Sequence, residues 1–230
     1  MIRLKPKASA QKADDTPDAA LPSTPPLPDT RLELRGIACR RGGRVLFEDL
    51  SLTLRAGEAL RILGPNGAGK TSLLRLLAGL LRPGAGELHC LVDGAARPAG
   101  RVSHLLSHLD AVKPGLTVSD ALGFWSRYAG GGGSVKGNLD RVGLGDMAAV
   151  RCGDLSAGQR RRLNLARLTA LPRPIWLLDE PTAALDAAGQ ELLTALIAEH
   201  RGAGGLVVAA THLPLDMGPA RSLRLDIAAA

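Results

Sequence analysis

An eight-residue stretch in the first third of the chain has the residue types and spacing of a phosphate-binding loop. It matches the pattern G-x-x-x-x-G-K-[ST] in full and consists of Gly64, Pro65, Asn66, Gly67, Ala68, Gly69, Lys70 and Thr71. The glycines of such a loop let successive backbone N–H groups face inward, while Lys70 reaches the terminal phosphates and the Thr71 hydroxyl ligates Mg²⁺. The pattern therefore predicts a nucleoside triphosphate site.

The residues on either side of this loop form the setting that phosphate binding requires. An apolar stretch over 59–63 predicts a strand that ends at the first glycine. A leucine-rich pattern from Ser72 to Leu81 predicts a helix that begins at Lys70, so that its positive end faces the phosphates. The alternative is a glycine-rich turn that matches by chance, and such a turn would lack this setting.

Two adjacent carboxylates follow a second apolar stretch. Residues 174–178 predict a strand, and Asp179 and Glu180 stand at its C-terminal tip. Ligands of open parallel sheets lie at these tips. Asp179 is then placed for Mg²⁺ coordination, and Glu180 for accepting a proton from the water that attacks the γ-phosphate. A charged strand end that meets solvent is the alternative, and the phosphate loop makes it the weaker one.

Two further polar residues stand at the ends of predicted elements. Residues 155–159 read Leu-Ser-Ala-Gly-Gln before a helical pattern over 160–169, so Ser156 occupies a helix start, where a hydroxyl and free N–H groups suit an anion. For Ser156 alone, an ordinary N-cap is the preferred interpretation. His212 follows a helix over about 187–200 and a strand over 206–210, and from that strand tip it can meet the γ-phosphate.

The remaining patterns describe the framework around these residues. Apolar stretches at 32–34, 45–47 and 50–54 predict short strands ahead of the phosphate loop. Residues 129–134 contain four consecutive glycines and predict a flexible loop, an interdomain linker being the less favoured interpretation. Residues 1–30 are rich in Pro, Ala and charge without any periodicity, which predicts a disordered tail before one folded domain over 31–230.

Composition narrows the classes of partner and compartment. The net charge of +7 belongs to residues 31–230, because basic and acidic residues balance in the tail. A polyphosphate ligand, an anionic membrane surface and nucleic acid all fit this charge, but 2% aromatic residues leave little for base stacking, so no nucleic acid is expected. Three scattered cysteines predict neither disulfides nor a zinc site and fit a reducing cytosol. No apolar run predicts a membrane span or a signal peptide.

The order of these motifs resembles that of the ATP-binding cassette (ABC) ATPases, over residues 31 to about 215. The resemblance implies an α/β P-loop NTPase fold with a mostly parallel sheet, flanking helices, an antiparallel β edge and a helical subdomain over about 102–170. It also implies that 64–72 bind ATP, that 175–180 hold the Mg²⁺ ligand and catalytic base, and that His212 is the switch histidine. A small-molecule kinase would lack the 155–159 motif, and a GTPase would need an N-K-x-D motif that is absent.

In this family the 155–159 motif, called the signature, completes the ATP site of a second subunit. The resemblance therefore implies that Ser156 and Gly158 contact ATP in trans and that the chain works as a homodimer. Residues 34–47, 66–80, 107–117 and 155–162 are most similar to the ATP-binding subunits of haem exporters of cytochrome c maturation. Those subunits are peripheral on the cytoplasmic face of the bacterial inner membrane, where integral membrane subunits are their partners.

Two positions depart from the wider family. An aromatic residue that stacks on adenine is usual where Arg41 stands, and the planar guanidinium of Arg41 can stack instead. The glutamine that usually contacts Mg²⁺ and relays to the membrane partner aligns with Leu109, which can do neither, so a low basal rate of hydrolysis is expected.

Other interpretations of single residues and of the whole chain stay open at this stage. Haem ligation by His104 and His108, or by His89, is weaker than a structural role. The arginines at 160–162 fit lipid headgroups, a partner or a solvated helix face equally well. An ABC subunit for another cargo would share every catalytic residue, and a non-transport ABC protein would normally need insertions or a second cassette.

Overall fold

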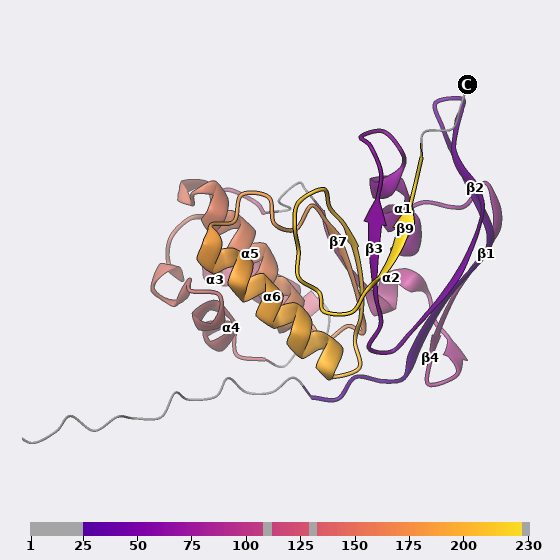
Figure 1. Cartoon of the computed structure of the whole chain (residues 1–230). Helices are drawn as coiled ribbons and strands as arrows, with labels where there is room; N and C mark the ends of the chain where they lie inside the picture. Colours follow the sequence, from indigo (N-terminus) through magenta and orange to yellow (C-terminus); the bar gives the residue numbers. More distant parts are fainter. Residues whose placement is uncertain (1–24, 108–111, 129–132, 227–230) are drawn as a thin grey trace, which may run out of the picture.

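The structure, a computed structural model, describes residues 25–107, 112–128 and 133–226 and contains two β-sheets (Figure 1). The antiparallel sheet has the strand order β2-β1-β4-β5. Its strands are β1 (Thr30–Arg41), β2 (Arg44–Arg55), β4 (Ala85–Val92) and β5 (Ala95–Ala96). The parallel sheet has the order β6-β7-β8-β3-β9. Its strands are β3 (Ala59–Leu63), β6 (Ser103–Leu106), β7 (Ile175–Asp179), β8 (Leu206–Ala210) and β9 (Arg221–Arg224).

Helices cover both faces of the parallel sheet, which explains why its central strands are apolar throughout. Every residue of β7 and β8 is buried, as expected for parallel strands with both faces covered. The helices are α1 (Lys70–Leu77), α2 (Ala99–Val102), α3 (Val118–Tyr128), α4 (Val135–Arg141), α5 (Ala157–Ala170) and α6 (Ala187–Gly202). Two short 3₁₀ turns span Gly145–Met147 and Cys152–Asp154.

The apolar core has two parts, one on each face of the parallel sheet. One packs α3, α4, α5 and α6 against Trp176 and Leu178 of β7. The other packs α1 and the antiparallel sheet against the opposite face, where Ile175 and Leu177 point. Figure 1 shows this layering, with α5 and α6 on one side of β7 and with β1 and β2 beyond α1 on the other. Alternate side chains of β7 thus pack into the two parts of the core on opposite faces of the sheet.

Side-chain caps fix the starts of three helices. The Ser134 hydroxyl accepts a hydrogen bond from Gly137 N ahead of α4, at 3.1 Å. Ser156 and Gln159 form a capping box at α5, with the Gln159 N–H donating to Ser156 Oγ at 3.2 Å and the Ser156 N–H donating to Gln159 Oε1 at 2.8 Å. A carboxylate oxygen of Asp186 accepts from Gly189 N at the start of α6.

The predicted α/β fold is confirmed, and several boundaries differ from the sequence patterns. The expected strands at 45–47 and 50–54 form one strand, β2. Register shifts in its pairing with β1 interrupt the alternation of buried residues, which explains why the sequence pattern predicts two strands. The antiparallel strands form a separate sheet and not an edge of the parallel one. The segment predicted as helical, about 102–170, begins with β6, which pairs with β7 inside the parallel sheet.

The described end of the segment predicted as a tail contacts the domain. The Leu27 N–H donates to the carbonyl of Ala203, and Thr30 already pairs with Val92 as the first residue of β1. Contacts with the domain are thus present a few residues before the predicted boundary at residue 30. Residues 1–24 and most of the glycine run, 129–132, lie outside the described residues.

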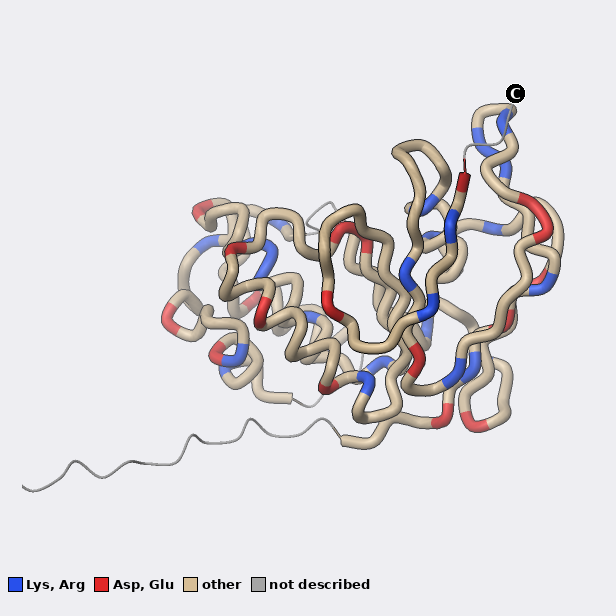
Figure 2. The backbone as a smooth tube through the Cα atoms, viewed as in Figure 1, with Lys and Arg blue, Asp and Glu red and all other residues tan. Residues whose placement is uncertain are grey.

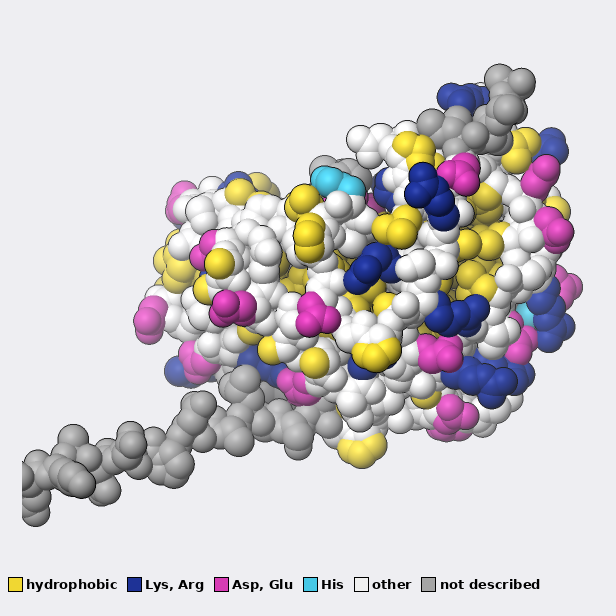
Figure 3. Space-filling model, in the orientation of Figure 1, with side chains coloured by type: hydrophobic (Ala, Val, Ile, Leu, Met, Phe, Trp, Pro, Cys, Tyr) yellow, Lys and Arg dark blue, Asp and Glu magenta, His cyan; other side chains and the backbone are white. Residues whose placement is uncertain are grey.

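Basic residues are frequent on the antiparallel sheet and on β9. Figure 2 shows Lys and Arg along β1, β2 and β9, and Figure 3 shows basic side chains exposed on the same side of the molecule. The three cysteines are buried and free, and burial raises the pKa of the Cys90 thiol to about 11. Among the helices of the described ranges, none has both the length and the apolar character needed to cross a membrane.

Candidate functional site

The phosphate loop connects the end of β3 to the start of α1, and its glycines are required by the backbone. Gly64, Gly67 and Gly69 have φ values of 142°, 84° and 99°, a region that residues with a side chain avoid. A Cβ on Gly64 would lie 2.1 Å from the carbonyl oxygen of Leu225, so only glycine fits there. The loop therefore stays open toward solvent, where Pro65, Asn66 and Gly67 are exposed, while Ala68 is buried beneath them.

Lys70 is the first residue of α1, and its ammonium group lies over the loop. Its Nζ donates hydrogen bonds to the carbonyl oxygens of Gly64 at 2.7 Å and Pro65 at 3.1 Å. The side chain is largely buried, with 9% of its surface exposed. A cation, a helix start and a curled backbone thus meet at one place, and this combination attracts phosphate oxygens. Ser72 follows, half-buried, in the first turn of α1.

Two oxygen-bearing side chains from distant parts of the sequence meet next to this loop. The Thr71 hydroxyl donates to Asp179 Oδ2 at 2.9 Å, which joins the start of α1 to the end of β7. Asp179 is 3% exposed, so its carboxylate is held inside the site. A hydroxyl and a carboxylate are hard oxygen donors, and Mg²⁺ is commonly bound by one or two such groups together with phosphates and water. The chemistry of these two residues fits a Mg²⁺ site, and their role as metal ligands stays a prediction.

Glu180 and His212 face each other across the ends of two neighbouring strands. The Nδ1 atom of His212 lies 2.9 Å from Glu180 Oε1, and the His212 N–H lies 3.4 Å from Oε2. The backbone N–H of Glu180 donates to the carbonyl of Ala210 at the tip of β8. Glu180 itself has φ 46°, a left-handed conformation that costs about 1 kcal/mol or more for a residue with a Cβ. His212 thus holds the carboxylate of Glu180, and Ala210 holds its backbone.

Arg161 contributes to the site in a way that the sequence did not reveal. The arginines at 160–162 were interpreted as candidates for lipid or partner contact or as a solvated face, and for Arg161 this is wrong because it is 2% exposed. Its guanidinium donates to backbone carbonyls at the end of β7, namely those of Asp179, Glu180 and Pro181, and to that of Ser107 after β6. The sequence feature that could have indicated burial of Arg161 is its helical spacing from Leu165 and Leu168, which are both buried.

The signature segment lies against the segment that precedes α6. A Cβ on Gly158 would lie 3.2 Å from the carbonyl oxygen of Ala184, so a small residue suits this position. Arg162 forms an ion pair with Asp186 at 2.8 Å, and this hydrogen bond, together with the one from Gly189 N, lowers the pKa of the Asp186 carboxyl. Ser156 is exposed at the start of α5.

Several other predicted residues lie apart from these contacts. Arg41 is exposed at the end of β1, and Phe47 of the adjacent strand β2 lies next to Gly69 of the phosphate loop. Leu109 and His108 lie outside the described residues. His104 is buried in β6 with Nε2 at 3.1 Å from the carbonyl of Leu171, a structural role. No group of three or more His, Cys, Asp or Glu suited to a metal occurs within the described ranges.

Comparison with known proteins gives one consistent family. The ABC transporter family profile matches residues 47–183. The cytochrome c biogenesis ATP-binding export protein CcmA of Rhodopseudomonas palustris strain BisB5 is 49% identical, over 85% of this chain and 98% of its own length. The protein of the same name from Rhizobium meliloti strain 1021 is 49% identical, over 85% and 97%.

Solved structures share the fold at lower identity. A dimeric ATP-binding cassette in a post-hydrolysis state, bound to ADP and Pi, superposes with a TM-score of 0.72 at 23% identity, over 86% of this chain and 97% of that one. An ATP-binding subunit of an ABC transporter gives a TM-score of 0.71 at 20% identity, over 79% of both chains. At these identities the likeness shows the fold alone.

Proposed function

This chain belongs to the ABC transporter family, and we propose that it is the ATP-hydrolysing subunit of a bacterial exporter for cytochrome c biogenesis. The observation that carries the specific function is the 49% identity to cytochrome c biogenesis export proteins over nearly their whole length. The observation that supports the chemistry is the meeting of Thr71, Asp179, Glu180 and His212 at the C-terminal edge of the parallel sheet.

ATP binding uses the loop backbone, Lys70 and the start of α1. Backbone N–H groups of 66–72 surround the β- and γ-phosphates, and Lys70 exchanges the carbonyls of Gly64 and Pro65 for phosphate oxygens. Thr71 and Asp179 would hold Mg²⁺, which neutralises charge on the phosphates when bound. Arg41, exposed at the end of β1, stacks its guanidinium on the adenine.

Hydrolysis uses the pair at the ends of β7 and β8. Glu180 orients the attacking water and accepts its proton, a role that suits a carboxylate held by fixed neighbours. His212 contacts the γ-phosphate from the next strand, and its hydrogen bond to Glu180 aligns the two side chains. Positioning and electrostatic stabilisation carry most of the rate enhancement in phosphoryl transfer, so the preformed contacts Thr71 to Asp179 and Glu180 to His212 matter directly.

The working unit is a homodimer in which the signature of one subunit closes the ATP site of the other. Ser156 and Gly158 belong to the start of α5, which Figure 1 shows on the opposite side of β7 from β3 and α1. Ser156 is exposed there with the N–H groups of a helix start, which suits a γ-phosphate supplied by a partner. A neighbour of the same fold is dimeric and holds ADP and Pi, which supports this arrangement.

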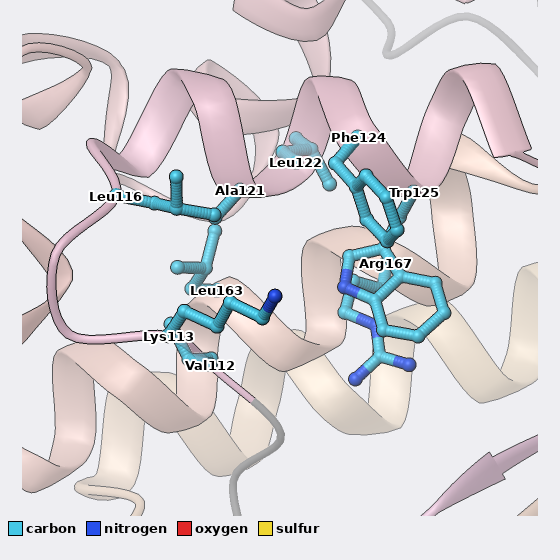
Figure 4. A pocket seen from close by; sticks show the side chains of 9 residues that line it. All are labelled: Val112, Lys113, Leu116, Ala121, Leu122, Phe124, Trp125, Leu163 and Arg167. Carbon is cyan, nitrogen blue, oxygen red and sulfur yellow. The ribbon is translucent and has the colours of Figure 1, made fainter.

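Integral membrane subunits are the expected partners, and α3 offers a surface for them. Phe124 and Tyr128 are 50% and 72% exposed and stack on each other. Beside them lies a cavity of about 80 Å³ between α3 and α5, with apolar walls and with Lys113 and Arg167 at its edge (Figure 4). Exposed aromatic clusters of this kind mark protein interfaces. Docking there would place the chain peripherally on the cytoplasmic face of the inner membrane.

A gene-replacement experiment tests the proposed function. Deletion of the gene should abolish covalently attached c-type haem, and the wild-type chain should restore it. Lys70→Ala should not restore it, because its loop lacks the phosphate-binding cation. The purified wild-type chain should hydrolyse ATP, and Lys70→Ala should not. Normal c-type cytochromes in the deletion strain would assign the chain to the export of another cargo, and the absence of hydrolysis by the wild-type protein would contradict the ATPase itself.

A further inference from the structure

The buried guanidinium of Arg161 bridges three structural elements that bear on catalysis. Its Nη2 atom donates to the carbonyls of Glu180 at 2.7 Å and Asp179 at 3.3 Å, and its Nε atom donates to that of Pro181 at 3.2 Å. Its Nη1 atom donates to the carbonyl of Ser107, directly after β6, at 2.8 Å. One side chain of α5 thus holds the ends of the neighbouring strands β6 and β7.

The segment that Arg161 holds needs external support. Glu180 has φ 46°, and a non-glycine residue persists in this left-handed conformation only where its surroundings fix it. The N–H of Glu180 is fixed by the carbonyl of Ala210, and the carbonyl of Glu180 is fixed by Arg161. The two peptide groups that flank the Glu180 Cα are therefore clamped from opposite sides, which sets the direction of the carboxylate toward His212.

The chemistry of the side chain suits this clamp. A guanidinium is planar and presents five donors in a rigid fork, so it can serve carbonyls on several sides at once. A lysine ammonium is a compact charge on a flexible stem and cannot reach all four carbonyls together. Arg161 also lies five residues after Ser156, the N-cap of the same helix, so α5 connects the signature segment to the Glu180 backbone.

We infer that Arg161 is a positioning residue that acts through Glu180. It fixes the backbone of the catalytic base and connects that backbone to α5, the helix that begins in the signature segment. This inference rests on the proposed ATPase function, and it goes beyond the family's motifs because it concerns main-chain carbonyls held by a buried side chain outside the ATP contacts. Loss of the clamp should slow the chemical step while nucleotide binding is kept, since the phosphate loop and Lys70 are held by other contacts.

The test is a double-mutant cycle between Arg161→Lys and Glu180→Gln, measured as kcat and KM for Mg-ATP. In the wild-type background, Arg161→Lys should lower kcat about 30-fold or more and change KM by less than about 3-fold. In the Glu180→Gln background, the same substitution should lower the residual rate by less than about 2-fold, because the group through which Arg161 acts is already lost.

Arg201→Lys supplies a matched control for the loss of a structural arginine. Arg201 also donates to three backbone carbonyls, those of Gly57, Met217 and Pro219. Gly57 lies before the start of β3, at the opposite end of this strand from the phosphate loop. Arg201→Lys should lower the melting temperature and leave kcat within about 2-fold at temperatures where the protein is folded. Arg161→Gln, which keeps two donors, serves as a second variant at the site.

The outcomes separate the inference from the proposed function. Equal losses from Arg161→Lys in both backgrounds would show that it does not act through Glu180, and a wild-type kcat in Arg161→Lys would overturn the inference while the ATPase function stands. If both Arg161 variants fail to fold and Arg201→Lys folds, the residue is structural and the inference is also overturned. In this experiment, an inactive wild-type protein would count against the proposed ATPase function.

Discussion

The glycine at position 69 shows how a single residue serves both binding and packing. Its φ of 99° turns the chain into α1, and a Cβ there would lie 3.1 Å from the Cβ of Leu46 and 3.2 Å from Cδ1 of Phe47. Phe47 belongs to the apolar core between the two sheets. The phosphate loop is thus pressed against β2, so that the loop geometry depends on the antiparallel sheet.

This geometry predicts different effects for two alanine substitutions in the loop. Gly69→Ala should lower ATP affinity about 10-fold or more and cost about 1–3 kcal/mol of folding free energy, because strain and overpacking add. Gly67→Ala is the matched control: its φ of 84° is strained as well, but a Cβ there meets nothing within 4 Å. Calorimetric titration with ATP and urea unfolding measure both quantities. Equal losses in the two variants would contradict a role for packing against β2.

Residue types indicated those parts of the candidate site whose residues belong to a short sequence motif. The phosphate loop, Asp179, Glu180 and His212 were recognisable because each has a typical position relative to a predicted strand or helix. Arg161 was not, because a run of three arginines gives no sign of which member turns inward, and its partners are main-chain carbonyls without any side-chain signature. The contact between Thr71 and Asp179 needed the fold to bring together residues 108 positions apart.

At the scale of elements, strands β6 and β7 and helix α6 bury two neutral histidines. The ring of His200 stacks on Trp176 of β7 with ring centroids 3.9 Å apart. Burial lowers the pKa of His200 to about 4, and burial together with the charges of Arg173 and Arg167 lowers the pKa of His104 to about 3. Both rings are therefore neutral in the folded protein at neutral pH.

These pKa values predict a loss of stability in mild acid. Unfolded histidine has a pKa of about 6.5, so below that pH the unfolded chain binds protons that the folded chain does not bind. Each histidine should then remove about 1.4 kcal/mol per pH unit, from about pH 6.5 down to its folded pKa, and none above pH 6.5. Urea unfolding between pH 7 and pH 5 should show this slope, and His200→Phe, which keeps the stack, should roughly halve it. A slope that His200→Phe leaves unchanged would exclude His200 as a cause.

The elements themselves were predictable to different degrees. Strand β8 and helix α5 match their sequence patterns closely, because burial of β8 on both faces and the cap at Ser156 leave clear boundaries. Strand β2 was split in prediction, since its register shifts relative to β1 break the period of two on which the interpretation relied. The position at which β6 ends and the position at which β1 begins are set by pairing with strands distant in the sequence. A local sequence pattern does not reveal such pairing.

At the scale of the whole molecule, the layering separates the phosphate loop from the signature segment. The phosphate loop lies with α1 and the antiparallel sheet, and the signature lies with α5 on the other side of β7 (Figure 1). In the proposed dimer, a single chain would therefore present a binding half and a closing half on different parts of its surface. Two chains arranged head to tail would complete two sites and convert ATP binding and hydrolysis into closing and opening.

Dimer capture by a hydrolysis-deficient variant tests this central claim most directly. Glu180→Gln should bind Mg-ATP, slow hydrolysis by about 10²-fold or more, and elute in gel filtration with light scattering at twice the monomer mass of 23.9 kDa. The double variant Glu180→Gln with Lys70→Ala, which lacks the phosphate-binding cation, should stay monomeric under the same conditions. A Glu180→Gln protein that remains monomeric with Mg-ATP and turns over at the wild-type rate would contradict the claim.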